Sequence, residues 1–344
     1  MNLESEVTKA LRRSMSAPVA EKVAPAVTII PSPAMISVPE GATLFSAVFG
    51  YVPSFGDFPV TVLPPSPNPD MARLVPAVDP DYVVQQEECA RIVAGVVDND
   101  RIMITGPTGS GKSSLIKYVA AKLNWPFLRI NMSGDVESAH ILGTREVKDG
   151  ATTWADGAVA EAVKGGALCL VDEWELMPAE IAMNLQNLLE DGGYLYLKEK
   201  PGSSEDRTYI PHANFRIMFA GNTVGQGDTT GAFTGTRPQN KATIDRFSAV
   251  VKLDYLTKDH EAAILTGKGV DKGQATSMVE FAALVRNAYN GGKVGLTISP
   301  RTLINWGRKS GRYGVAKALD VCFMEKLTED DRTSLGELYR KVFG

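Results

Sequence analysis

Residues 106–113 read Gly106-Pro107-Thr108-Gly109-Ser110-Gly111-Lys112-Ser113 and fit G-x-x-x-x-G-K-[ST], the pattern of a phosphate-binding P-loop. Residues 101–105 before it predict a short buried strand, and residues 114–123 after it predict a helix with apolar residues along one side. The backbone N–H groups of the loop and the dipole of the helix then favour binding of an anion at the N-terminus of this helix. We expect Lys112 to reach the β- and γ-phosphates of ATP and the Ser113 hydroxyl to ligate Mg²⁺, with Ser114 completing the ATP contacts.

The composition is that of an ordinary soluble chain, long enough for two domains and a tail: 344 residues, 44% hydrophobic and 22% charged. With a net charge of −4, no overall field attracts it to nucleic acid or to an anionic membrane, although a local basic patch stays open. The three cysteines match no metal or redox spacing and suit a reducing environment. No apolar run reaches the roughly 20 residues of a membrane span. We therefore expect a cytoplasmic protein.

The chain divides into three predicted parts. Residues 1–42 contain prolines that break helix and sheet, which predicts a flexible Ala/Pro-rich N-terminal arm. Residues 43–255 should hold an N-terminal segment and an α/β nucleotide-binding domain, and residues 256–344 a small all-helical lid domain.

Strands and helices alternate in the middle of the chain. Besides residues 101–105, apolar strands are predicted at 127–131, 167–171, 215–221 and 249–253. Helices are predicted at 82–97, with Asp79 as its cap, and at 178–190. This alternation implies a five-stranded parallel sheet with helices on both faces. From Lys258 onward the apolar period is helical, over residues 260–267, 275–289, 300–309, 314–327 and 334–342.

An apolar strand that ends in Asp172 and Glu173 has the Walker B form. Asp172 is expected to hold Mg²⁺ through water and to support Ser113, and Glu173 to orient and activate the attacking water. The alternative is an ordinary strand end with two acids. Their position downstream of a P-loop favours a hydrolysis site over a site that only binds nucleotide.

Three further polar residues follow in order. Asn222 comes directly after the fourth strand and is expected to contact the γ-phosphate, although asparagine is also a common turn residue. Arg246, just before the fifth strand, suits charge stabilisation of phosphoryl transfer in a neighbouring subunit; otherwise it forms a surface ion pair with Asp245 or Glu261. Arg301 opens a helix of the lid, where the helix dipole disfavours a cation, and this favours a nucleotide-facing role over a solvated one.

This order of motifs resembles the AAA+ ATPases over roughly residues 80–344. Residues 194–210 look like the β-hairpin that such proteins carry before the fourth strand, and residues 133–160 look like an insert in their second helix. Together these features resemble the MoxR branch.

Within that branch the chain resembles the CobS-like ATPase subunits of aerobic cobaltochelatases. The resemblance rests on residues 78–82, 123–126 with Arg129 and Asn131, 235–236, 245–247 and 299–302, and Phe49-Gly50 suits the N-terminal segment of that family. It implies a homo-oligomer, a hexameric ring or spiral with ATP at subunit interfaces, and a von Willebrand factor A domain protein as partner. CobS-like proteins also occur outside cobalamin synthesis, so the substrate stays open.

We therefore expect an oligomeric ATPase motor that remodels or activates a protein partner, and two other function classes compete with it. One is a nucleic-acid motor, whose inserts would surround DNA. Against it, the inserts hold few basic residues, mainly Lys148, Lys198, Lys200 and Arg207, and the chain is slightly acidic. The other is a nucleotide-gated scaffold with little turnover, against which Glu173 and Arg246 argue.

Overall fold

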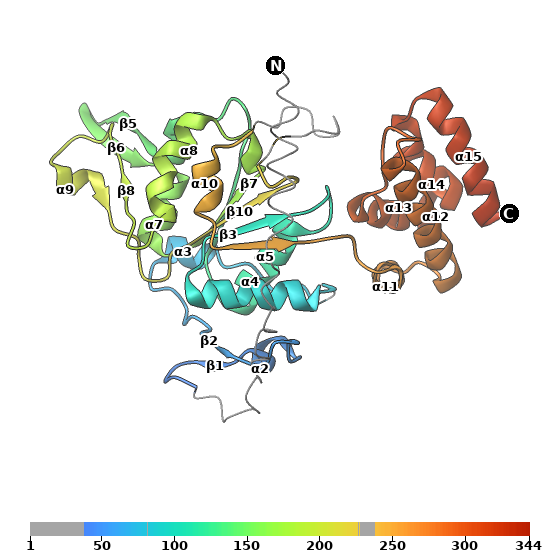
Figure 1. The fold of residues 1–344 in the computed structure, drawn as a ribbon, viewed down its shortest axis with the longest axis horizontal. Coiled ribbons are helices and arrows are strands. Elements are labelled where there is room, and N and C mark those ends of the chain that lie inside the picture. The colour runs from blue at the N-terminus through green and yellow to red at the C-terminus, as the bar shows by residue number, and fades with distance from the viewer. Residues whose placement is uncertain (1–37, 81, 226, 228–237) are drawn as a thin grey trace, which may run out of the picture. The chain divides into compact units, whose positions relative to one another are not determined.

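The computed structural model describes residues 38–80, 82–225, 227 and 238–344 (Figure 1). Most of the predicted N-terminal arm lies outside the described residues, as do Asp81 and residues 235–237. Residues Val38–Gly344 form one compact unit. The division of this unit between residues 255 and 256 stays a prediction.

Five parallel strands form the central sheet, in the order β11-β3-β10-β7-β4. They are β3 (Ile102–Thr105), β4 (Phe127–Asn131), β7 (Leu168–Asp172), β10 (Arg216–Gly221) and β11 (Ala249–Lys252). All five predicted strands and the parallel α/β fold are therefore confirmed. β3 and β7 are buried throughout, as expected for strands between two helical layers. Because the strands are parallel, β3, β7 and β10 end at the same edge of the sheet, with Thr105, Asp172 and Gly221 as their last residues.

Helices cover both faces of this sheet (Figure 1). On one face, α4 (Gln86–Asp98) and α5 (Lys112–Lys122) pack on alternate strand residues such as Ile102 and Ile104. On the other, α7 (Ala158–Gly165) and α8 (Ala179–Leu185) pack on the intervening residues, among them Met103. Successive side chains of a strand point to opposite faces of the sheet, so the same apolar strands contribute to both cores.

Two hairpins and several short helices and strands make up the rest of this part of the chain. The two predicted inserts are hairpins: β5 (Gly143–Lys148) pairs with β6 (Ala151–Asp156), and β8 (Leu195–Tyr196) pairs with β9 (Thr208–Tyr209). The remaining short elements are β1 (Thr43–Leu44), α2 (Phe45–Phe49), β2 (Pro59–Val60), α3 (Pro69–Arg73), α6 (Ser138–Ile141), η1 (Trp174–Leu176), η2 (Gln186–Leu189), α9 (Ser204–Arg207) and α10 (Lys241–Asp245).

The C-terminal part is helical, as predicted. It comprises α11 (Lys258–Gly267), α12 (Lys272–Asn290), α13 (Pro300–Tyr313), α14 (Val315–Cys322), η3 (Met324–Lys326) and α15 (Glu329–Phe343). These helices have their own apolar core, in which Phe281 packs edge-on against Trp306. None of the helices in the described part of the chain is long and apolar enough to cross a membrane.

The sequence placed some helix boundaries wrongly. The helix predicted at 82–97 begins at Gln86, and its cap is Gln85 instead of Asp79. Residues 82–85 are not helical because tertiary contacts hold them: the Tyr82 ring stacks on Tyr118 at 4.8 Å, and the Gln85 amide donates to the Asp254 carbonyl. The last helix begins at Glu329, five residues before its predicted start, because the Thr328 side chain caps it.

Two other predicted helices end early. The helix predicted at 178–190 tightens into η2 after Leu185. The helix predicted at 314–327 stops at Cys322, and the buried residue Phe323 leaves helical geometry there.

Candidate active site

The P-loop forms the connection between β3 and α5, and its glycines adopt conformations that other residues rarely take. Gly106, Gly109 and Gly111 all have positive φ angles. A Cβ atom added at Gly106 would lie 2.2 Å from the carbonyl oxygen of Leu253, the residue that follows β11. The glycines therefore let the loop pass close to a neighbouring strand before α5 begins at Lys112.

Lys112 is buried and held across the mouth of this loop. Its ammonium group donates to the carbonyls of Gly106 at 2.8 Å and Pro107 at 3.2 Å, and to the Asn222 side chain at 2.9 Å. Burial lowers the pKa of Lys112, and the charge of Glu173 opposes that shift. The loop thus holds the ammonium group of Lys112 beside its own carbonyls and the Asn222 side chain.

The Ser113 hydroxyl meets the carboxylate of Asp172 at the end of β7. Ser113 Oγ donates to Asp172 Oδ2 at 2.5 Å, and Arg129 Nε on β4 lies 2.7 Å from the same oxygen. The Asp172 side chain is almost fully buried, whereas that of Arg129 is half exposed. The two residues predicted to hold Mg²⁺ are therefore in contact.

The site fits a nucleotide bound together with Mg²⁺. Ser110 Oγ is buried at the loop and has no hydrogen-bond partner among the described residues, so it is available to a phosphate oxygen. Within the described ranges no group of three or more His, Cys, Asp or Glu could hold a metal alone. Mg²⁺ commonly uses one or two protein oxygens together with substrate phosphates, and Ser113 with Asp172 is such a donor set.

Glu173 has an unusual backbone and a perturbed acidity. Its φ of 55° places it in the left-handed region, which is sparsely populated by residues other than glycine. Burial raises the pKa of Glu173, the charges of Asp172 and Glu175 raise it further, and Lys112 opposes the shift. A raised pKa makes Glu173 a stronger base than an ordinary surface glutamate.

Asn222 links the P-loop to the acid pair. It follows β10, and its side-chain oxygen accepts from Lys112 while its side-chain nitrogen donates to Glu173 Oε2 at 3.3 Å. The structure thus brings together Lys112, Glu173 and Asn222 from three segments far apart in the sequence.

These groups line one pocket of about 390 Å³. The P-loop residues Thr108–Ser114, Asp172, Glu173 and Asn222 contribute to its wall. Arg301, an exposed residue in the first turn of α13, lines it as well. Of the predicted site residues, all but Gly106, Pro107 and Arg246 therefore border the same pocket.

Arg246 lies elsewhere, beside a second hollow of about 630 Å³. It forms an ion pair with Glu190, at 2.5 Å between Nε and Oε1, and it also donates to the Ala242 carbonyl. The two predicted alternatives were wrong about this partner: within the described residues Glu261 pairs with Arg286 instead, and no ion pair joins Arg246 to Asp245.

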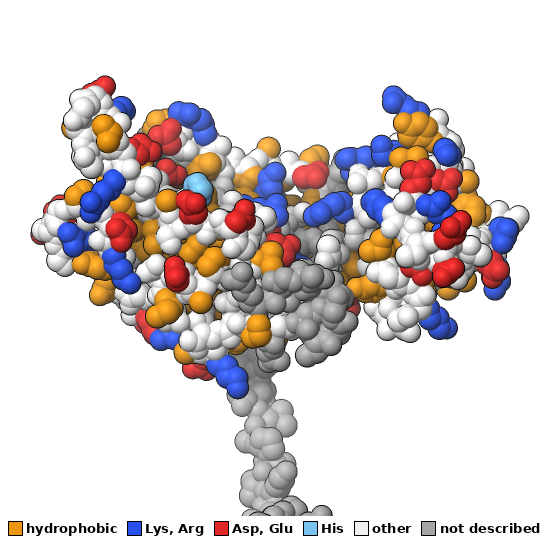
Figure 2. Space-filling view, turned by 90° about the horizontal axis from the view of Figure 1, so that it is seen from above, with side chains coloured by type: hydrophobic (Ala, Val, Ile, Leu, Met, Phe, Trp, Pro, Cys, Tyr) orange, Lys and Arg blue, Asp and Glu red, His pale blue; other side chains and the backbone are white. Residues whose placement is uncertain are grey.

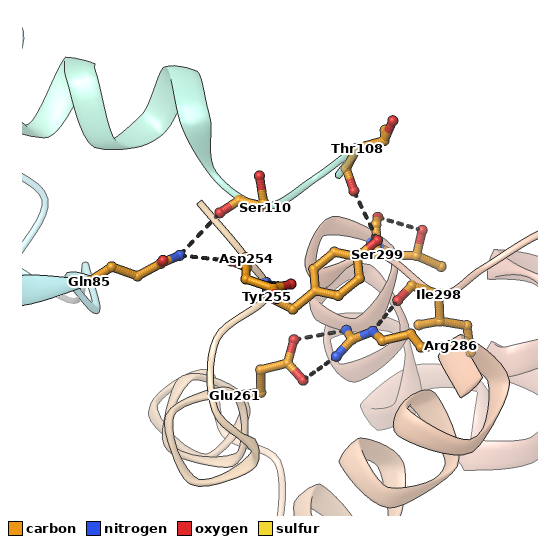
Figure 3. Close-up of polar contacts among 10 residues, drawn as sticks. Gln85, Thr108, Ser110, Asp254, Tyr255, Glu261, Arg286, Ile298 and Ser299 are labelled. Atoms are coloured by element: carbon orange, nitrogen blue, oxygen red, sulfur yellow. Dashed lines mark hydrogen bonds and ion pairs between the residues drawn. The ribbon is translucent and has the colours of Figure 1, made fainter. Parts of the chain in front are cut away.

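Figure 3 shows contacts near the P-loop that sequence reasoning missed. Gln85 donates to the carbonyls of Ser110 at 3.4 Å and Asp254 at 3.1 Å, and the Tyr255 hydroxyl donates to the Thr108 carbonyl at 3.4 Å. The guanidinium of Arg286 lies over the Tyr255 ring at 4.3 Å. No local pattern marks Gln85 or Tyr255, because their partners are far away in the sequence.

Arg129 and Glu175 are two charged residues at the site whose roles were also missed. Arg129 is a charged residue within β4, and it belongs to the segment that carries the family resemblance, but its contact with Asp172 was not predicted. Glu175 follows the acid pair by two residues and is 1% exposed; a third acid so close to the first two was the available signal.

Comparison with known proteins gives two matches to family profiles. The profile described as AAA domain (dynein-related subfamily) matches residues 101–247, and the profile described as CbbQ/NirQ/NorQ C-terminal matches residues 261–342. The first match runs from β3 past Arg246, and the second covers most of α11 to α15.

Similar proteins align with two thirds or more of the chain. The aerobic cobaltochelatase subunit CobS of Sinorhizobium sp is 37% identical over 281 residues, which is 78% of this chain and 83% of that protein. Protein NorQ of Paracoccus denitrificans is 26% identical over 273 residues, 78% of this chain and 96% of that protein. Protein CbbQ of Hydrogenophilus thermoluteolus is 28% identical over 230 residues, 67% of this chain and 81% of that protein.

Proposed function

Because the chain belongs to the AAA+ ATPases of the MoxR-like CobS, CbbQ and NorQ type, we propose that it is an oligomeric, Mg²⁺-dependent motor that uses ATP hydrolysis to remodel or activate a protein partner. The observation that carries this proposal is the hydrogen-bonded set of Lys112, Asn222 and Glu173 beside the Ser113–Asp172 contact. A nucleotide-binding scaffold would need the lysine and serine but not a base.

In the proposed reaction, a water oxygen attacks the γ-phosphorus while the bond to the β–γ bridging oxygen breaks, so that ADP and phosphate leave. Glu173 takes up a proton from this water, and its raised pKa suits that role. Asn222 fixes the orientation of Glu173 and Lys112 through its side-chain amide. Mg²⁺, when held by Ser113 and Asp172, neutralises charge on the phosphates.

The position of Arg246 supports an assembly in which one subunit completes the site of the next. Arg246 borders a hollow separate from the P-loop pocket, and its side chain is 29% exposed, so it is accessible to a neighbouring copy. An arginine supplied in this way accelerates phosphoryl transfer about 10³- to 10⁵-fold in other ATPases and GTPases. We propose a hexameric ring or spiral in which Arg246 acts in trans.

Mixing two inactive variants tests the trans assignment. Arg246→Ala has a complete base but supplies no arginine, and Glu173→Gln has the opposite defect. Each alone should be nearly inactive, whereas a mixture should recover hydrolysis because mixed oligomers contain some intact sites. A wild-type rate that does not depend on protein concentration, and that Arg246→Ala leaves unchanged, would contradict the proposal.

For the partner, we propose a protein with a von Willebrand factor A domain, in keeping with the CobS-type family. The Glu173→Gln variant should retain ATP and therefore hold such a partner long enough for isolation. A Lys112→Ala variant, which should not bind ATP, serves as the control. Equal recovery of the partner with both variants would count against an ATP-dependent partnership.

A nucleic-acid motor is the competing assignment, and the hairpins give it little support. Lys200 contacts the Tyr209 hydroxyl and the Asp206 carbonyl, and Arg145 donates to the Glu199 carbonyl, so both are engaged within the protein. On the face drawn in Figure 2, basic and acidic side chains are interspersed. Stimulation of hydrolysis by DNA, with steep salt dependence, would reverse this ranking.

A further inference from the structure

Glu175 is a buried acid that takes no direct part in the reaction described above, although its charge helps to raise the pKa of Glu173. It lies in η1, is 1% exposed, and its Oε1 accepts from the backbone N–H groups of Asn222 at 2.5 Å and Thr223 at 3.1 Å. Burying a carboxylate is costly unless hydrogen bonds satisfy it, and here they satisfy Oε1 alone, since Oε2 is buried with no hydrogen-bond partner among the described residues. The contacts show where that carboxylate acts: on the backbone at the end of β10.

The surroundings of Glu175 leave it little freedom. The neighbouring Trp174 is fully buried and packs edge-on against Phe219 and Phe247, at ring-centroid distances of 6.1 and 5.4 Å. The other carboxylate oxygen lies where a side chain at Gly221 would be, since a Cβ atom there would be 2.0 Å from Oε2. The chain is thus shaped around this carboxylate.

The residue that Glu175 holds is itself part of the site. Asn222 uses its backbone N–H on Glu175 and its side chain on Lys112 and Glu173. A shift of the Asn222 backbone therefore moves the amide that orients both groups. Because β10 ends at Gly221, the sheet no longer fixes Asn222, and in the described part of the chain the acceptor of its N–H is Glu175.

We propose that Glu175 is a positioning residue for ATP hydrolysis, which holds Asn222 in place through its backbone N–H group. This inference rests on the hydrolysis proposed above. It requires the reach of the side chain more than its charge, because the contact is made through hydrogen bonds to two neighbouring N–H groups. Glu175 does not itself touch the pocket, so it should affect turnover with little effect on ATP affinity.

Two substitutions separate reach from charge. Glu175→Gln keeps the length and an acceptor oxygen, whereas Glu175→Asp keeps the charge but is one methylene shorter. We expect Glu175→Asp to lower kcat about 100-fold, the usual scale for a site displaced by about 1 Å. Glu175→Gln should lose about tenfold at most, since a neutral acceptor forms a bond roughly half as strong as a charged one. Glu180→Gln, at an exposed position on α8, is the matched control and should leave kcat unchanged.

Binding and coupling measurements distinguish positioning from a general structural role. The affinity for a fluorescent ATP analogue should stay within about threefold of wild type in both variants. Adding Glu175→Asp to the Asn222→Ala variant should lower kcat by less than about a further threefold, because the effect of Glu175 on kcat passes through the Asn222 side chain. Thermal unfolding identifies any variant that is not folded in the assay, and Glu175→Gln decides the matter if Glu175→Asp is unfolded.

Three kcat results would overturn the proposal: Glu175→Gln is less active than Glu175→Asp, Glu175→Gln loses more than about tenfold, or Glu175→Asp keeps full activity. A loss of ATP affinity that parallels the loss of kcat would also overturn it. So would effects of Glu175→Asp and Asn222→Ala on kcat that are fully additive. Failure of the proposed function looks different. In that case wild type would not hydrolyse ATP, or Glu173→Gln would be as active as wild type.

Discussion

On the proposed trans role of Arg246, replacing Glu190 by glutamine should raise the ATPase rate of the dilute protein, because it removes the ion-pair partner that holds Arg246 within its own subunit. The two side chains form an ion pair in which Arg246 is 29% and Glu190 50% exposed. Exposed pairs of this kind contribute about 0–1 kcal/mol, so breaking the pair should free Arg246 by a factor of up to about five. The contact of Arg246 with the Ala242 carbonyl is unaffected by the substitution.

The assay is the ATPase rate per subunit over a range of protein concentrations. Glu190→Gln should be up to about five times faster than wild type below the concentration of half-maximal rate, and equal to it at saturation. Asp191→Asn is the control, because Asp191 is fully exposed and lies 3.9 Å from Arg101. A release of Arg246 is refuted if Glu190→Gln is slower than or equal to wild type throughout, if Asp191→Asn shows the same gain, or if the gain persists when Arg246→Ala is added.

Other predictions concern the base, the helical part and the P-loop. Glu173→Gln should lower kcat by about 100-fold or more while ATP still binds. Because the pKa of Glu173 is raised, the wild-type rate should be lost on acidification at a higher pH than if the base were an ordinary glutamate, and a pH–rate profile checks this. Glu261→Ala should lower the free energy of unfolding by about 3–5 kcal/mol in urea, because it leaves Arg286 buried without its partner; a change below about 1 kcal/mol would contradict this. Gly106→Ala should weaken ATP binding at least about tenfold in a titration, since the added Cβ would lie 2.2 Å from the Leu253 oxygen.

The sequence predicted the sheet and most of the site because both depend on short-range patterns. The G-x-x-x-x-G-K-[ST] run needs glycine wherever φ is positive, and the structure has positive φ at Gly106, Gly109 and Gly111. Apolar strands that end in Asp172 or Gly221 could be recognised for the same local reason. The structure then places the ends of these strands at one edge of the sheet, because the strands are parallel.

Helix boundaries were less predictable because tertiary contacts override local preference. Residues 82–85 have no strong helix breaker after Pro80, yet the stacking of Tyr82 on Tyr118 and the hydrogen bonds of Gln85 keep them out of α4. The early end of α14 has a similar cause, in the burial of Phe323.

The sequence alone determined which residues meet within the P-loop and which acids follow it, since their spacing along the chain sets those contacts. Only the tertiary structure decided which distant residue each of them faces: Arg129 beside Asp172, Glu190 beside Arg246, and Glu175 beneath Asn222. The physical reason is that these pairs join different elements. Their distances depend on the order β11-β3-β10-β7-β4 and on how the helices pack on it, and no spacing along the chain encodes them.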